Sequence, residues 1–74
     1  MRLSDAEIGT KAVVVRVHGQ GALRKRLSEI GFVKEKIVEV IRSAPLGTPF
    51  VYKILGTEIA IRTDAASMIE VIPI

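Results

Sequence analysis

Hydrophobic and polar residues alternate along much of the chain, and this period of two predicts short β-strands. The predicted strands cover residues 11–17, 37–43, 50–54, 58–62 and 68–72. Glycine, proline and short polar stretches separate them, as the turns of an antiparallel sheet require. The pattern therefore predicts a mostly β fold, a small five-stranded SH3-like barrel with one short helix between the first and second strands. We expect residues 1–74 to form a single domain of this kind.

The alternation also predicts which side chains point into the barrel. The expected interior consists of Val13, Val15, Val17, Val38, Val40, Ile59, Ile61, Ile69 and Val71. This assignment leaves over Val14, Ile41, Leu46, Met68 and Ile72. Two interpretations of these leftover residues stay open: a second, minor core under the helix and loops, or an exposed contact surface.

Helical spacing appears only at residues 22–30, where Leu23, Leu27 and Ile30 recur at i, i+4 and i+7. Gly31 follows at the position where many helices end in a left-handed conformation. Near the N-terminus, residues 4–7 have the Ser-x-x-Glu spacing of a capping box, which predicts one further helical turn before the first strand.

The charges on the predicted helix oppose its dipole. Arg24, Lys25 and Arg26 occupy the first turn, whereas Glu29 lies near the end. Each such placement costs about 0.3–1 kcal/mol relative to the opposite charge. The three cations are therefore either a solvated basic face or a contact for something outside the helix.

Composition and charge indicate a cytosolic module with an acidic or phosphate-bearing partner. The chain has no cysteine, so disulfides and thiolate metal sites are excluded. Residues 1–37 carry eight basic and four acidic side chains (+4), and residues 38–74 carry three and four (−1). Asp5 and Glu7 interrupt the N-terminal stretch before an export signal forms, and the longest apolar run, residues 12–15, is too short to insert into a membrane.

The chain offers no constellation for catalysis or metal binding. His18 is the only histidine and is expected to be an exposed loop residue, and the eight carboxylates are scattered. None of the serines has a histidine or a nucleophile-elbow motif beside it. We therefore expect no enzyme activity, no metal and no cofactor. The Gly19–Gly21 segment is too incomplete for a dinucleotide fingerprint, although a helix N-terminus there could hold a phosphate or carboxylate.

Nucleic-acid binding is an alternative use of a small basic barrel. Small barrels that bind single-stranded DNA or RNA stack the bases on aromatic side chains. The chain has only three aromatic residues, and Phe50 and Tyr52 are needed for packing on one strand. We therefore expect no nucleic acid as a partner.

Several segments together resemble the family of ferrous iron transport protein A (FeoA). They are residues 3–5 with Gly9, residues 23–32, 38–40 and 44–49, Gly56 with residues 58–62, and residues 69–71. The resemblance implies an SH3-like barrel and a cytosolic accessory role in bacterial ferrous iron uptake. Its partner would be the cytoplasmic, GTP-binding domain of a FeoB-type permease at the inner face of the membrane. Glu35 departs from the family pattern, which commonly has a turn glycine there.

The predicted partner-binding residues are Arg24, Lys25 and Arg26 on the helix, together with Leu46. The loop at residues 44–49 has a proline near each end, so it can present Leu46 without a large ordering cost. Self-association through the leftover aliphatic positions stays open. A further alternative is the SH3-like domain of an iron-dependent repressor.

Overall fold

The computed structural model describes all 74 residues and contains the five strands and the helix at residues 22–30 in the predicted order, together with a second, short helix before the last strand. The elements are the 3-10 turn η1 (Leu3–Asp5), β1 (Lys11–Val17), α1 (Ala22–Ile30), β2 (Ile37–Ser43), β3 (Phe50–Ile54), β4 (Thr57–Ile61), α2 (Thr63–Ala66) and β5 (Ile69–Pro73). The bounds of β1, β2, β3 and α1 agree with the prediction. β4 lies one residue earlier than predicted and β5 one residue later.

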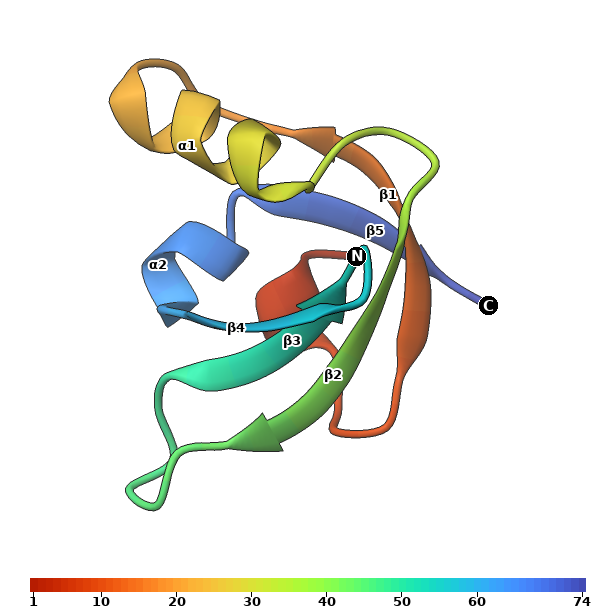
Figure 1. Ribbon diagram of the computed structural model, residues 1–74, viewed down its shortest axis with the longest axis vertical. Helices are drawn as coiled ribbons and strands as arrows, with labels where there is room; N and C mark the ends of the chain where they lie inside the picture. Colours follow the sequence, from red (N-terminus) through yellow and green to blue (C-terminus); the bar gives the residue numbers. More distant parts are fainter.

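The strands form one antiparallel sheet in the order β4-β3-β2-β1-β5, which confirms the mostly β prediction. The sheet curls, but its edge strands β4 and β5 do not pair with each other, so hydrogen bonds do not close the barrel. Figure 1 shows α1 at one end of the long axis and the loop between β2 and β3 at the other. None of the helices has the length and apolarity needed to cross a membrane.

The inward face predicted for β1 is wrong at two of its three positions. Val17 is buried as expected, but Val13 and Val15 are only half-buried. Ala12 and Val14 take their places, each 1% exposed. The cause is a bulge: the register between β1 and β5 shifts beside Val15. One extra residue in a strand reverses the alternation beyond it, so Val14 and Val17 can both face the core.

The other strands mostly follow the predicted alternation. Buried positions that match the prediction are Val38, Val40, Ile61, Ile69 and Val71. Ile59 is half-buried against this core. Among the leftover residues besides Val14, Ile41 and Met68 are half-buried, whereas Leu46 and Ile72 are 98% and 59% exposed. The leftover set is therefore divided between the core margin and the surface.

The N-terminal helical turn exists, but the predicted capping box does not form. The turn η1 starts at Leu3, whose side chain is completely buried, and its N-cap is Arg2, with no side-chain cap. Burial of Leu3 places Ser4 inside the turn, where its hydroxyl is not in the N-cap position. Packing of one leucine therefore outweighs the local capping signal.

Candidate partner-binding surface

The helix α1 carries the predicted cations, and its packing decides where they point. Leu27 is buried at 1% exposure and Ile30 packs at the core margin, but Leu23 at the start of the helix is 42% exposed. Gly31 ends the helix with φ +133°, and its amide donates to the carbonyls of Leu27 and Ser28. The C-terminal half of α1 is therefore fixed on the core, while its N-terminal half stays open to solvent.

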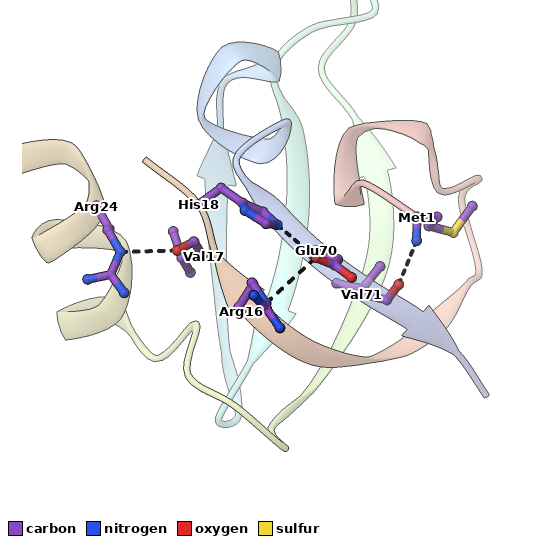
Figure 2. Close-up of polar contacts among 7 residues, drawn as sticks. All are labelled: Met1, Arg16, Val17, His18, Arg24, Glu70 and Val71. Carbon is purple, nitrogen blue, oxygen red and sulfur yellow. Dashed lines mark hydrogen bonds and ion pairs between the residues drawn. The ribbon is translucent and has the colours of Figure 1, made fainter. Parts of the chain in front are cut away.

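Consecutive residues on a helix point about 100° apart, so the three cations do not share one direction. Arg24 lies toward β1, where its Nε donates to the carbonyl oxygen of Val17 at 3.0 Å (Figure 2). Arg26 lies on the other side of α1 and lines a groove toward β4 and α2. Lys25, between them, lines none of the hollows on the surface and is exposed. The contact with Val17 gives Arg24 a structural role that its sequence position did not reveal.

The hollow beside Arg26 is an apolar groove between α1, β4 and α2, which we call the helix groove. It has a volume of about 260 Å³. Its lining residues are Leu23, Arg26, Leu27, Ile30, Ile59, Ala60, Ile61, Arg62, Asp64 and Ala65. Most of them are hydrophobic, and the exposed charges come from Arg26, Arg62 and Asp64. Neither arginine takes part in a salt bridge.

Leu46 lies far from this groove. It is 98% exposed in the loop formed by residues 44–49, which we call the loop tip. The loop is closed by short backbone bonds: the amide of Ala44 donates to the carbonyl of Pro49, and that of Gly47 donates to the carbonyl of Ala44. Because the loop tip and α1 lie at opposite ends of a molecule about 30 Å long, they do not form one continuous patch (Figure 1).

His18 is not the free loop residue that the sequence suggested. It is half-buried, and its Nε2 lies 2.7 Å from Oε1 of Glu70 on β5 (Figure 2). The hydrogen bond from His18 lowers the pKa of Glu70 below its ordinary value, and the electrostatic influence of His18, Arg16 and the N-terminus adds to this effect. The strand pairing that joins Arg16 and Glu70 creates this cluster, so no local sequence signal could have revealed it.

The aromatic residues are not available as a base-stacking platform. Tyr52 is 2% exposed, and its burial raises the pKa of its hydroxyl. Phe50 is half-buried and stacks on it with ring centroids 6.4 Å apart. No group of three or more histidine and carboxylate side chains lies together in a way that could hold a metal ion.

The fold of the chain and its sequence both match those of a known family. The model of the FeoA domain matches residues 1–73. The chain belongs to the FeoA family. A relative from Porphyromonas gingivalis, an Fe(2+) transport protein A/Fe(2+) transporter FeoB fusion protein, is 45% identical over 96% of the chain. The chain spans only 8% of that relative's length, so the match covers its FeoA part alone.

A second relative is matched over nearly its whole length. The Putative Fe(2+) transport protein A of Campylobacter jejuni is 30% identical over 96% of both chains. The crystal structure of Stenotrophomonas maltophilia FeoA, a prokaryotic SH3 domain protein complexed with zinc, is 35% identical and superimposes with a TM-score of 0.85. That match covers 96% of this chain and 88% of the solved one, and it confirms the SH3-like prediction.

The same fold also occurs in regulators of transcription. A manganese-dependent transcriptional repressor superimposes with a TM-score of 0.87 at 16% identity, and the match covers 41% of the repressor chain. At this identity the likeness shows the fold alone. The repressor alternative therefore gains no support beyond a shared architecture.

The structure adds residues that the sequence prediction missed. Arg62 and Asp64 join Arg26 at the helix groove, although Arg62 is 36 positions away from Arg26 in the sequence. The predicted strand at residues 58–62 gave the only available signal, because it placed Arg62 at a strand end. Its meeting with α1 depends on how β4 and the helix pack, which the local pattern does not specify.

Proposed function

We propose that residues 1–74 form one FeoA-like domain that binds the cytoplasmic domain of a FeoB-type ferrous iron permease and regulates it. In this proposal the domain works in the cytoplasm at the inner face of the membrane, as a protein-binding module without catalytic activity of its own. The observation that carries the proposal is the Porphyromonas gingivalis relative, in which Fe(2+) transport protein A and FeoB are parts of one chain. Fusion keeps two functionally linked proteins at a high effective concentration.

The surface of the domain supports a protein partner better than a nucleic acid. The helix groove offers aliphatic side chains beside unpaired arginines, a combination common at protein interfaces. A single-stranded nucleic acid would need aromatic side chains to stack on, and Tyr52 is buried. The domain should therefore bind single-stranded DNA or RNA weakly at physiological salt.

A pull-down with the permease's cytoplasmic domain tests the proposal. The double variant Lys25→Glu/Arg26→Glu reverses two exposed charges without touching the bond from Arg24 to Val17. The helix dipole favours an anion near the start of α1, but both reversals also place a carboxylate three or four residues before Glu29, where like charges repel, so the melting temperature should stay close to that of the wild type. The amount of permease domain retained should fall. Leu46→Asp, at the loop tip, measures separately whether the predicted second contact exists.

The proposal fails if the wild-type domain does not retain the permease domain, or if it binds a single-stranded oligonucleotide more tightly at physiological salt. If the permease domain is retained and only Leu46→Asp reduces binding, the docking face is the loop tip. If only the helix variant reduces binding, the docking face is α1. In both cases the proposed function stands, and the contact is assigned to one end of the molecule.

A further inference from the structure

The strand β4 has a free edge. It is the outermost strand on its side of the sheet and pairs only with β3. The turn at Leu55 and Gly56 has two residues, both with positive φ, and Ile54 faces Thr57 across it. In such a hairpin the pair that flanks the turn is hydrogen-bonded, and the bonding then alternates along the strands. The backbone groups of Glu58 and Ala60 consequently point away from β3.

These outward backbone groups have no partner elsewhere in the molecule. Both residues are exposed, and none of the backbone hydrogen bonds outside the helices and strands involves either of them. An edge with free amides and carbonyls is a template for an added strand unless the protein blocks it. Here β4 carries no proline, lysine or bulge that would block such pairing.

The helix groove lies along this edge, because Ala60 belongs to its lining. Its volume of about 260 Å³ is below the usual size of a small-molecule pocket, roughly 300–1,000 Å³. The groove therefore suits one aliphatic side chain of a larger partner. Arg26 stands on the α1 wall and Arg62 directly follows β4, and Asp64 is the one carboxylate of the lining. Glu58 on β4 is paired with Arg42 at 2.9 Å. The local excess of positive charge favours an acidic partner.

We infer that β4 accepts an extended, acidic segment of a partner protein as an additional strand. The segment's backbone bonds to Glu58 and Ala60, one of its aliphatic side chains enters the helix groove, and its carboxylates approach Arg26 and Arg62. Recognition of this kind takes affinity from main-chain bonds and specificity from side-chain pockets. The identity of the partner as the permease rests on the proposed function above, whereas the binding mode rests on the edge and the groove.

A second copy of the domain is a weaker candidate for this edge. It would bring its own Arg26 and Arg62 toward a groove that already has an excess of positive charge. Like charges brought together across an interface disfavour association. We therefore expect β4 to pair with a different, acidic protein, and the experiment below also detects pairing between two copies of this chain.

The test uses a blocked synthetic peptide of about eight residues, the length of a typical strand, in which glutamate and valine alternate. It is titrated into the isotope-labelled full chain, and amide chemical shifts are recorded. We expect saturable shifts at Glu58, Ala60 and the residues of α1. A peptide that is N-methylated at every second residue loses the donors that face β4, and its affinity should fall on the order of tenfold. Replacement of glutamate by lysine should also weaken binding.

Two variants of the chain separate the edge from the groove. Ala60→Pro removes an amide that points away from β3, so the ladder between β3 and β4 stays intact while the free edge is blocked. Arg26→Glu/Arg62→Glu leaves the strand unchanged and reverses the charges. Lys36→Glu reverses a charge at an exposed residue that lines none of the hollows, and it serves as the matched control for the charge reversal. We expect Ala60→Pro and the double charge reversal each to lose peptide affinity on the order of tenfold, and Lys36→Glu to keep it.

The inference is overturned if folded Ala60→Pro binds the peptide as the wild type does, or if the peptide shifts residues at the loop tip instead. If the chemical shifts of the β4 amides change with protein concentration when no peptide is present, the edge binds a second copy of the chain, and the inference is also overturned. The pull-down distinguishes this inference from the proposed function. Permease binding that survives in Ala60→Pro rejects the strand addition alone, whereas peptide binding without permease binding rejects the permease alone.

Discussion

The two ends of this small domain expose apolar side chains in opposite structural settings. At the helix end, α1 is fixed by the burial of Leu27 and by Gly31, whose backbone lies against the side chain of Leu55. At the loop tip, Leu46 projects from residues 44–49, which bond only to one another across the loop base. The first surface depends on the tertiary fold, and the second depends on local turn chemistry.

This difference determines how binding experiments can be interpreted. A change at the helix end can weaken partner binding either by removing a contact or by loosening α1. A change at the loop tip removes a contact without affecting the core, because an almost fully exposed side chain contributes little to stability. Variants at the helix end therefore need a stability measurement beside each binding measurement.

The largest expected contrast between the two ends is in the free energy of unfolding that is lost when a leucine at each end is truncated to alanine. Leu27→Ala leaves a cavity in the core, and we expect a loss of about 2–5 kcal/mol in the free energy of unfolding. Leu46→Ala should change it by no more than about 0.5 kcal/mol, because the side chain is 98% exposed. Urea denaturation followed by circular dichroism measures both. A loss at Leu46 comparable to that at Leu27 would contradict the assignment of the loop tip as structurally independent.

A smaller difference is expected between two glycines with positive φ. Gly31 has φ +133° and Gly47 has φ +96°, so alanine at either position is strained by about 1–3 kcal/mol. A Cβ at Gly31 would also lie 2.8 Å from Cδ1 of Leu55, whereas at Gly47 it would meet nothing within 4 Å. We therefore expect Gly31→Ala to lose more stability than Gly47→Ala in denaturant titrations.

The contact with Leu55 can be isolated in a double-mutant cycle. In a Leu55→Ala background the clash disappears, so the excess cost of Gly31→Ala over Gly47→Ala should shrink. Leu55→Ala alone should be mild because its side chain is 60% exposed. If the excess persists in that background, it comes from backbone strain at the end of α1 and not from the packed side chain.

The same contrast between local and tertiary determinants explains what the sequence could predict. The helix at residues 22–30 and its glycine stop were correct because spacing and C-cap chemistry are local. The inward face of β1 was wrong because a bulge beside Val15 depends on the register with β5. Glu35, noted as a departure from a family glycine, adopts φ +76°, so its turn keeps a glycine-like conformation despite the substitution.

The candidate site was less predictable than the fold for the same reason. The predicted cations are present and exposed, but helix geometry separates them, and the structure joins Arg26 to Arg62 instead. Leu46 is exposed as expected but lies at the opposite end of the molecule (Figure 1). Sequence patterns identified exposed residues, and tertiary packing decides which of them lie together.

The smallest expected effect concerns the polar tether near the helix end. Glu70 on β5 lies between His18 and Arg16, and His18 begins the segment that leads into α1 (Figure 2). The pKa of Glu70 is lowered in the folded chain from the ordinary value of 4.5. A carboxyl with a lowered folded pKa stabilises the protein above its unfolded pKa, and this contribution is lost as the pH falls through the folded pKa. No such tether exists at the loop tip.

We expect Glu70→Gln to melt below the wild type at neutral pH, and the two melting temperatures to converge as the pH falls from 4.5 through the lowered pKa of Glu70. Differential scanning calorimetry across this range measures the convergence. Glu7→Gln is the matched control, because Glu7 is exposed and takes part in no salt bridge. The difference between the melting temperatures of this variant and the wild type should therefore stay constant across the pH range. If the difference in melting temperature between Glu70→Gln and the wild type also stays constant as the pH falls, the contact with His18 does not stabilise the folded chain. The helix end would then be held by its apolar contacts, its glycine stop and the bond from Arg24 to Val17.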